Sequence, residues 1–365
     1  PGTAYTCNGL GNVGAGPEGG KSPVLGGRII SGLVPANIIP DEVMADHPNH
    51  YRAMIIESGN PVHSLPDSPK WRKAMRALEC SVVIDIAMTE TAREADYVLP
   101  ATTQLEKAEA TFFNFEFPEN YFHVRAPLFP APDGVLDEAE IHARITEALG
   151  GIPSGILDEL DSALTEGGRE AFRNLVFKKL GDDPTIGRIA PVLLYRTLGK
   201  TLPNKMQIGA AVWAVCHQHA LAKRSSVEAA GITGEGMDLG DNLFDAIIDG
   251  PSAVVISKED WSDIWNRVPG GAINFDLPDM LGAAANLNSE EPQETTDEFP
   301  LLMSAGERRD YTANTIFRNP AWRRKDRDGA MYMNPEDAAR LNLGDGSNAR
   351  ITSQRGAVEV LVEVN

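Results

Sequence analysis

Short apolar runs recur along the first third of the chain, each followed by turn residues. The runs Ala53–Glu57, 82–85 and Tyr97–Pro100 are rich in Val, Ile and Leu. Runs of this length, apolar on both faces and bounded by turn residues, are typical of strands buried in a parallel sheet. We therefore expect three buried strands within residues 41–128.

Helical patterns separate these three runs. Asp67 can cap a helix, Pro69 suits its first turn, and apolar side chains then follow at helical spacing: Trp71, Ala74, Met75 and Leu78. A shorter helix is expected at 89–95. Strands and helices that alternate with tight links predict an α/β fold with a mostly parallel open sheet and crossover helices.

The middle of the chain has the spacing of helices rather than strands. We expect helices over 138–149, ended by Gly150 and Gly151, then over 158–180 and 206–222. His217 and His219 fall in the last of these. Because they are two residues apart, they point to different sides of the helix and are interpreted as structural rather than as a shared metal site.

Alternating polar and apolar positions return near the end of the chain. A strand is expected at 301–304, a helix that begins with Asn334 and Pro335, and a hairpin built from 349–353 and 358–362. This pattern predicts the start of a small β-barrel. The expected domains are an α/β domain at 1–128 with a Gly- and Pro-rich loop at 1–40, a mainly helical region at 129–297, and an incomplete barrel at 298–365.

Composition excludes several classes of protein. A formal net charge of -19 and a pI near 4.8 argue against nucleic acid, whose phosphates the chain would repel. No apolar stretch approaches the ~20 residues of a membrane span. Cys7, Cys80 and Cys216 are far apart and form no C-x-x-C pair, so neither a disulfide framework nor an iron–sulfur site is encoded here. Cys80 is expected to be a buried small apolar residue.

Both ends of the chain suggest a piece of a longer protein. The sequence opens with Pro1 rather than Met, with no signal-like segment, and it closes at Asn365 within a strand-like alternation. Near the start, 9–14 reads G-x-G-x-x-G, but no apolar strand precedes it and no helix can follow it. A flexible loop is therefore the favoured interpretation over a nucleotide-binding loop.

Polar residues follow the three expected strands at their carboxyl ends, where ligands bind to open α/β sheets. Gly59 and Asn60 follow the first strand, Asp85 ends the second, and 100–103 follow the third. A carboxylate at a strand end can accept the N–H groups of a guanine edge or hold a ribose. It can also cap the following helix, and the residues alone leave both roles of Asp85 open.

Three ordered segments carry a family resemblance. They are 57–61 (ESGNP); the block 83–107, with D, TETA, ADYVLP and EK in order; and 304–315 (SAGERRDYTANT) together with 334–338 and 344–346. This set resembles the dimethyl sulfoxide reductase family of molybdopterin oxidoreductases, which includes formate dehydrogenases and nitrate reductases. The resemblance covers most of 40–150 and 298–365.

The resemblance implies a cofactor of two molybdopterin guanine dinucleotides that hold molybdenum or tungsten. It implies that Gly59, Asn60 and Asp85 contact the guanosine end of one dinucleotide. Lys107 would contact a polar group of the same cofactor, and Glu140 would make another contact. A second stretch of pterin or pyrophosphate would be wrapped by the residues Ser304, Ala305, Gly306, Glu307, Arg308, Arg309, Tyr311 and Asn314.

The matched segments imply cofactor binding but no catalytic or metal-ligating residue. In the family the metal ligand and the cysteines of a 4Fe-4S cluster lie upstream, and Cys7 sits in a loop that does not match a ligand position. The Gly and Arg that the family often carries after the EK pair are absent, so Asn114 and Glu116 receive no role.

The expected function is therefore that of the C-terminal part of a molybdenum or tungsten oxidoreductase resembling formate dehydrogenase or nitrate reductase. The fragment alone would be inactive; its partners would be the missing N-terminal part and an electron-transfer protein, and its location cytoplasmic. One alternative is a non-catalytic, cradle-like subunit of a respiratory NADH dehydrogenase. A nicotinamide-dependent dehydrogenase is disfavoured by the context of 9–14.

Overall fold

A computed structural model gives the fold of the chain. It describes residues 20–29, 33–110, 116–250, 252–266, 268–273, 275–287, 295–304, 330–354 and 356–365. The chain divides into two compact units, 1–62 with 66–273, and 63–65 with 274–365. Each unit is described by itself, and the domain boundaries at 128 and 297 stay predictions.

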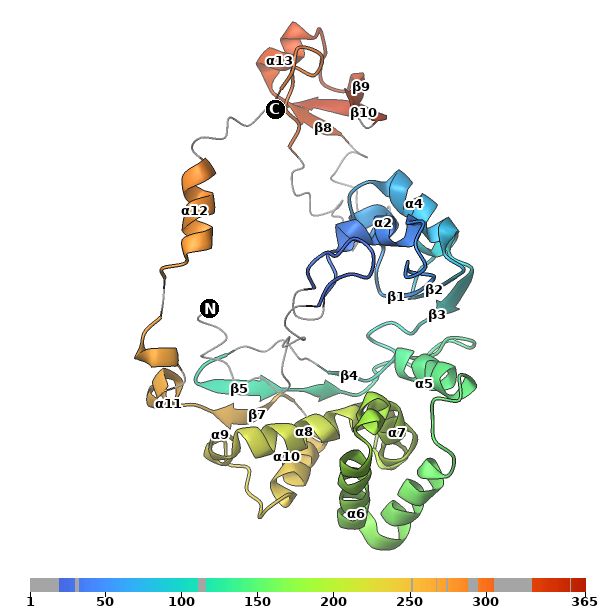
Figure 1. Cartoon of the computed structure of the whole chain (residues 1–365), viewed down its shortest axis with the longest axis vertical. Helices are drawn as coiled ribbons and strands as arrows, with labels where there is room; N and C mark the ends of the chain where they lie inside the picture. The colour runs from blue at the N-terminus through green and yellow to red at the C-terminus, as the bar shows by residue number, and fades with distance from the viewer. Residues whose placement is uncertain are drawn as a thin grey trace. The chain divides into compact units, whose positions relative to one another are not determined.

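The first unit contains the expected parallel sheet. Strands β1 (Ala53–Glu57), β2 (Cys80–Asp85) and β3 (Tyr97–Pro100) lie in the order β1-β2-β3, and both pairs are parallel (Figure 1). The bounds of β1 and β3 agree with the apolar runs; β2 ends with its run at Asp85, where turn residues stop the ladder, but begins two residues before it, at Cys80. The prediction of an α/β fold with a parallel open sheet is confirmed.

Crossover helices connect the strands as expected. In α4 (Ser68–Ala77) the Asp67 side chain accepts a hydrogen bond from the Lys70 N–H over 3.2 Å, and the helix buries Trp71, Ala74 and Met75. Between β2 and β3 the chain makes only the 3-10 helix η2 (Ala92–Glu94), which is shorter than predicted. The other helical elements of this part are η1 (Ala36–Ile38), α2 (Ile39–Met44) and α3 (Pro61–Ser64).

A further helix, α5 (Glu138–Ala148), packs on the carboxyl half of the sheet through Ile141, which shares a buried cluster with Ile84 and Ala101. Just before α5 the chain runs beside β3: Ala101 and Leu136 form a parallel bridge. Through this single bridge a fourth chain segment pairs with the edge of the sheet. It brings the start of α5 to the same edge as the strand ends.

Two expectations about burial are wrong. The expected buried strand β1 exposes alternate residues, and the Ile55 side chain is 51% exposed, because the face that carries Ala53, Ile55 and Glu57 is not covered in the described structure. Cys80 is half-buried rather than buried, since it is the first residue of β2 and lies at the end of the ladder. An apolar run therefore located β1 correctly but did not report how much of it is covered.

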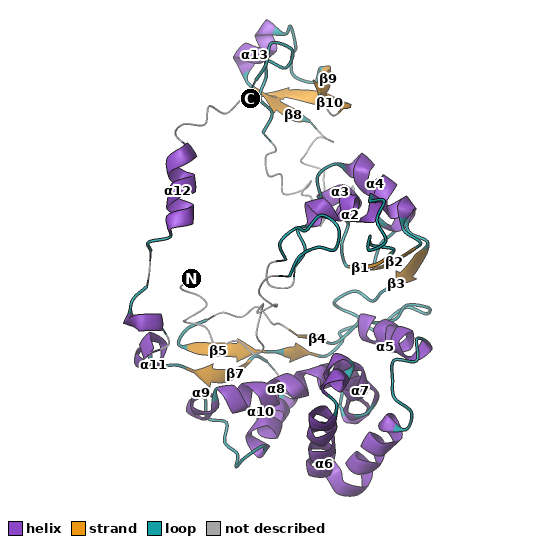
Figure 2. Ribbon diagram, viewed as in Figure 1, coloured by secondary structure: helices purple, strands orange, loops and turns teal. Residues whose placement is uncertain are grey.

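The middle of the chain is helical, as expected (Figure 2). The long helix α6 bends at Gly168, which has a positive φ of 70°. His217 and His219 are buried in α8, 1% and 6% exposed, as structural residues. The helices are α6 (Ile156–Asp182), η3 (Pro184–Arg188), α7 (Ala190–Arg196), η4 (Leu198–Thr201), η5 (Gln207–Gly209), α8 (Ala210–Ala222), α9 (Arg224–Ala229), α10 (Asp238–Asp249), α11 (Trp261–Asn266) and η6 (Pro269–Gly271).

Two small antiparallel ladders lie in the first unit. One pairs β5 (Glu119–Phe122) with β7 (Val254–Lys258), and the other pairs β4 (Glu109–Ala110) with β6 (Val124–Arg125). The aromatic side chain of Phe122 and the Ile256 side chain enter the large core of the helical region. Through these ladders, residues 109–110 and 119–125, which follow the parallel sheet, pack against the helices.

The second unit holds α12 (Pro278–Leu287) and a three-stranded sheet in the order β8-β10-β9, made of β8 (Met331–Met333), β9 (Asn348–Ser353) and β10 (Gly356–Val364). Asn334 caps α13 (Pro335–Arg340) by accepting from the Glu336 N–H over 2.8 Å, as expected. The hairpin is also confirmed. The strand expected at 301–304 is wrong, because these residues are exposed and form no regular structure.

Two absences apply to the described part of the chain. None of its helices is both long and apolar enough to cross a membrane. Its His, Cys, Asp and Glu side chains form no group of three or more placed to ligate a metal ion.

Candidate functional site

The carboxyl ends of the strands meet at one edge of the sheet. Asp85 lies opposite Pro100 in the β2–β3 ladder, and the Ala101 N–H donates to the Asp85 carbonyl oxygen over 3.1 Å. Asn60, three residues past β1, follows the neighbouring strand. In an open parallel sheet this edge is where ligands bind, because no crossover helix covers it. We call it the carboxyl edge.

The Asn60 side chain holds two loops of the carboxyl edge together. Its Nδ2 donates to Glu90 Oε2 over 2.6 Å, while its Oδ1 accepts from the Thr91 N–H at 3.1 Å and from Thr91 Oγ1 at 2.8 Å. The Val62 N–H in turn donates to Thr91 Oγ1 over 3.1 Å. Asn60 therefore shapes this edge from within the protein, and its predicted contact with a cofactor stays a prediction.

Gly59 lies in the sharp turn that leaves β1. The preceding residue, Ser58, has a left-handed φ of 52°, and its N–H donates to the Ile84 carbonyl oxygen over 3.0 Å. A Cβ added to Gly59 would meet its neighbours at 3.6 Å or more, which is ordinary contact. No contact within the described protein requires glycine at position 59. The close approach of a ligand, which the resemblance predicts, would explain why a glycine stands there.

Asp85 has one carboxylate oxygen engaged and one available. Asp85 Oδ1 accepts from the Ala87 N–H over 3.1 Å and so stabilises the turn after β2. Among the described residues Oδ2 receives no hydrogen bond. The capping role and the binding role of Asp85 are therefore compatible, with one oxygen serving each.

A pocket of about 380 Å³ opens beside the carboxyl edge, past β3. Lys107 and Glu140, the two residues predicted to contact the cofactor beyond the strand ends, both line it. The structure thus brings together two side chains that are 33 positions apart in the sequence. The remaining walls include Thr102, Glu106, Pro127, Phe129, Pro130, Val135, Leu136, Asp137, Arg144, Tyr195, Lys205 and Ile208.

Lys107 is held in place by an ion pair. Its Nζ lies 2.5 Å from Glu138 Oε1, and the two side chains are 16% and 12% exposed. An ammonium has three donors, so this pair leaves Lys107 able to bind a further acceptor in the pocket.

Glu140 is more fully engaged by the protein. It accepts hydrogen bonds from Arg144 Nε at 2.7 Å, from Arg196 Nη1 at 2.5 Å and from Tyr195 Oη at 3.1 Å. Burial alone would raise the pKa of Glu140, but the bonds from Arg196, Arg144 and Tyr195 outweigh burial and lower it. Glu140 is therefore an ionised wall of the pocket.

Two polar side chains of the pocket were not among the predicted cofactor contacts, although Thr102 belongs to the segment 100–103 noted at the end of the third strand. Thr102 is 3% exposed, and its Oγ1 has no hydrogen-bond partner in the described structure. Asp137 caps α5 by accepting from the Glu140 N–H through Oδ1 at 2.7 Å, which leaves Oδ2 without a partner among the described residues. The sequence could have indicated Asp137, because it precedes the predicted helix as a capping residue. The position of Thr102 depends on the backbone contact with Leu136.

Burial raises the pKa of Asp137, and the nearby carboxylates of Glu140 and Glu138 raise it further. A carboxylate in such a position gains from an added hydrogen-bond donor, because a donor restores part of the hydration that burial removed. A buried hydroxyl without a partner gains in the same way. Asp137 therefore presents unmet hydrogen-bonding capacity to the pocket, and Thr102, which also lines the pocket, holds a buried hydroxyl without a partner in the described structure.

Of the residues predicted to wrap a second part of the cofactor, the structure describes only Ser304. Ser304 is exposed and lies in no regular element. The other members lie outside the described residues: Ala305, Gly306, Glu307, Arg308, Arg309, Tyr311 and Asn314. Cys7, Asn114 and the 9–14 motif also lie outside them.

The residues present fit the guanosine end of a dinucleotide. A pocket of about 380 Å³ falls within the range of small-ligand sites, and proline and aromatic walls suit a flat base. Guanine offers N–H donors to a carboxylate such as Asp137, and a ribose offers hydroxyls to Thr102, whereas Asp85 is not among the residues that line the pocket. Lys107 supplies a positive charge for a phosphate oxygen.

Comparison with known families matches both units. The model of the molybdopterin oxidoreductases matches residues 14–127, and the model of the molydopterin dinucleotide binding domain matches residues 301–365. Both support the expected cofactor, two molybdopterin guanine dinucleotides with molybdenum or tungsten.

Curated relatives agree in part of the chain. The chain is 35% identical over 109 residues to the F420-dependent formate dehydrogenase subunit alpha of Methanocaldococcus jannaschii, covering 30% of this chain and 16% of that protein. It is 32% identical over 99 residues to the assimilatory nitrate reductase catalytic subunit of Bacillus subtilis, 27% of this chain and 13% of that one. A trimethylamine-N-oxide reductase of Vibrio parahaemolyticus is 42% identical over 57 residues, 16% of this chain and 7% of the other.

The fold has a solved counterpart. Acetylene hydratase from Pelobacter acetylenicus superimposes with a TM-score of 0.55 at 14% sequence identity, over 92% of this chain and 38% of that one. The chain thus spans well under half the length of the relatives and of the structure that it matches. The two family models and these relatives agree with the sheet and its carboxyl edge: over 14–127 and 301–365 the chain resembles the molybdopterin oxidoreductases of the dimethyl sulfoxide reductase family.

Proposed function

We propose that this chain forms the part of a molybdenum or tungsten oxidoreductase that holds the guanosine end of one molybdopterin guanine dinucleotide. The observation that carries the proposal is the pocket beside the carboxyl edge, which Lys107 and Asp137 line together with Thr102, whose buried hydroxyl has no partner in the described structure. These groups offer a cation, a carboxylate and a hydroxyl around a space of nucleoside size.

The proposed contacts follow from the chemistry of each group. Asp85 Oδ2 and Asp137 Oδ2 are acceptors for guanine N–H groups or ribose hydroxyls. Lys107 lies within the pocket as a donor to phosphate, and its pairing with Glu138 fixes its side chain before the ligand arrives. Thr102 accepts or donates through its hydroxyl. None of these residues is assigned a catalytic step.

The activity that we propose for the whole protein is an oxidoreductase reaction of the formate dehydrogenase or nitrate reductase kind. The metal and its pterins, when bound, supply the redox chemistry. This chain's residues would bind and orient the dinucleotide, while the metal ligand, any 4Fe-4S cluster and the contacts to an electron-transfer partner would come from other parts of the protein.

The experiment is a cofactor analysis of the whole protein that carries this chain. Molybdenum and tungsten are measured by mass spectrometry, and GMP is measured after acid hydrolysis of the bound dinucleotide. We expect two GMP released per metal atom. A protein that folds but yields neither metal nor GMP would overturn the proposal and favour a non-catalytic cradle-like subunit instead.

A further inference from the structure

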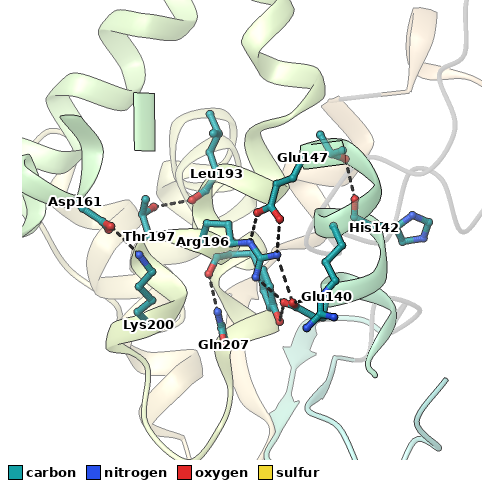
Figure 3. Close-up of polar contacts among 12 residues, drawn as sticks. Glu140, His142, Glu147, Asp161, Leu193, Arg196, Thr197, Lys200 and Gln207 are labelled. Carbon is teal, nitrogen blue, oxygen red and sulfur yellow. Dashed lines mark hydrogen bonds and ion pairs between the residues drawn. The ribbon is translucent and has the colours of Figure 1, made fainter. Parts of the chain in front are cut away.

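Helix α5 is held from two sides within the first unit. On one side Ile141 packs against Ile84 and Ala101 of the parallel sheet. On the other side α5 contacts α7, the helix that ends at Arg196 (Figure 3). The start of α5 carries Asp137 and lies in the pocket wall, so whatever fixes α5 also fixes this part of the pocket.

Arg196 is the main polar link between the two helices. Its Nε and Nη2 donate to the two carboxylate oxygens of Glu147 at 2.6 and 3.1 Å, and its Nη1 donates to Glu140 Oε2 at 2.5 Å (Figure 3). The Arg196 side chain is only 18% exposed. A planar guanidinium that meets one carboxylate with two parallel bonds and a second carboxylate with another has little freedom to rotate.

The link continues from Glu140 to the pocket. The Glu140 carboxylate also accepts from Tyr195 Oη at 3.1 Å, and Tyr195 itself lines the pocket. The backbone N–H of Glu140 donates to Asp137 Oδ1 at 2.7 Å. Fixing the residue at position 140 therefore fixes the donor that engages Asp137 Oδ1, while Asp137 Oδ2 has no partner among the described residues.

We propose that Arg196 is a positioning residue for dinucleotide binding, acting through Glu140 on Asp137. This inference rests on the proposed function and deepens it. It gives the helical region a role that the sequence did not reveal: α7 sets the geometry, and hence the affinity, of a pocket that the α/β part and the helical region line together.

A neighbouring ion pair provides the matched control. Lys200, in the 3-10 helix that follows α7, donates to Asp161 over 2.7 Å (Figure 3). Neither residue lines the pocket. Removing this pair removes a cation close to Arg196 without touching α5. A general effect of lost charge or lost stability would appear in both variants, whereas a positioning effect would appear only at Arg196.

The test measures how fast the whole protein loses its dinucleotide during dialysis, followed as GMP released by acid hydrolysis. We expect Arg196→Met to lose GMP about tenfold faster than the wild type, the loss typical of one charge-assisted contact. The rate for Arg196→Lys should fall between these two rates, because an ammonium keeps the positive charge but cannot make the two parallel bonds of the guanidinium to Glu147. Lys200→Met should match the wild type.

A double-mutant cycle separates positioning from simple destabilisation. In an Asp137→Asn background, Arg196→Met should accelerate the loss no further, because its effect passes through Asp137. Full additivity of the two substitutions would overturn the proposal, as would a rate for Arg196→Met equal to that of Lys200→Met. If Arg196→Met does not fold, Glu147→Gln weakens the same fork and should still accelerate the loss; an unchanged rate would then overturn the proposal.

The outcome also separates this inference from the proposed function. If Lys107→Met and Asp137→Asn both leave the rate of loss unchanged, the dinucleotide is not held in this pocket and the proposed function fails. If those two accelerate the loss and Arg196→Met does not, the pocket stands and only the positioning role of Arg196 fails.

Discussion

The Thr102 N–H donates a hydrogen bond of 3.0 Å to the Leu136 carbonyl oxygen. This bond continues the sheet beyond β3 and brings two loops, separated by 34 positions, to one edge. The Thr102 side chain is consequently buried beside the pocket wall that leads to Asp137. Four chain segments therefore meet at the carboxyl edge: the ends of the three strands and the segment around Leu136.

Thr102 should matter for binding and not for stability. Valine has nearly the same shape, and the Thr102 hydroxyl has no partner in the described structure, so Thr102→Val should leave the free energy of unfolding within about 1 kcal/mol of the wild type. Loss of the dinucleotide should accelerate several-fold. Urea unfolding and GMP retention measure the two effects.

Thr89 gives the opposite case. Its Oγ1 accepts from the Ala92 N–H over 3.0 Å, and Thr89→Val removes this bond from a buried site. It should lower stability by about 1 kcal/mol and leave the rate of dinucleotide loss unchanged. If Thr102→Val behaved like Thr89→Val, the hydroxyl of Thr102 would be a structural group.

At Asp85 two substitutions separate charge from turn geometry. Asn keeps an oxygen that can accept from the Ala87 N–H, whereas Ala removes it. Both Asp85→Asn and Asp85→Ala should lower the dinucleotide content of the whole protein, because each removes the carboxylate that would accept from guanine. Only Asp85→Ala should also lower the melting temperature. Unchanged GMP content in Asp85→Ala would rule out the binding role.

Acid stability should depend on Asp241, a buried residue of α10 outside the pocket. Burial would raise its pKa, but hydrogen bonds from His217, Trp213 and Arg173 outweigh burial and lower it. A pKa lowered by folding gives a stabilisation that is present above the unfolded value of about 3.9 and is lost as the pH falls through the lower, folded value.

Asp241→Asn should therefore remove most of this dependence while costing stability at neutral pH. Trp213 Nε1 donates to Asp241 Oδ1 over 2.7 Å and the Arg173 guanidinium contacts Oδ2, so the substitution leaves a buried cation partly unpaired, at a cost of about 3 kcal/mol. Urea unfolding at several pH values measures both. A variant as stable as the wild type at pH 7 would show that the network contributes nothing.

Much of the α/β part was predictable because its signals are local. The apolar run Ala53–Glu57 ends at a turn, and Asp67 caps the helix that follows, so boundaries could be read from neighbouring residues. The hairpin of β9 and β10 was equally local. The strand expected at 301–304 failed because an apolar run forms a strand only where a partner strand pairs with it.

Only part of the pocket could be predicted, because the sequence reports local patterns and not contacts between distant residues. Lys107 and Glu140 were identified by resemblance, and the structure places both in one wall. Thr102 was noted at the end of the third strand, but its burial depends on a contact with Leu136, and the position of Tyr195 depends on contacts of the same long range, which no spacing rule reports. Likewise, the link from Arg196 to Glu140 joins side chains 56 positions apart.

The pocket beside the carboxyl edge is the proposed site of the guanosine end of the dinucleotide. The most direct measurement is the GMP content of the whole protein after gel filtration in Asp137→Asn and in the double variant Lys107→Met with Glu138→Leu, which leaves no buried carboxylate unpaired. We expect each to retain about tenfold less GMP than Lys200→Met, with all proteins folded. GMP content equal to that of Lys200→Met in both variants would contradict the account.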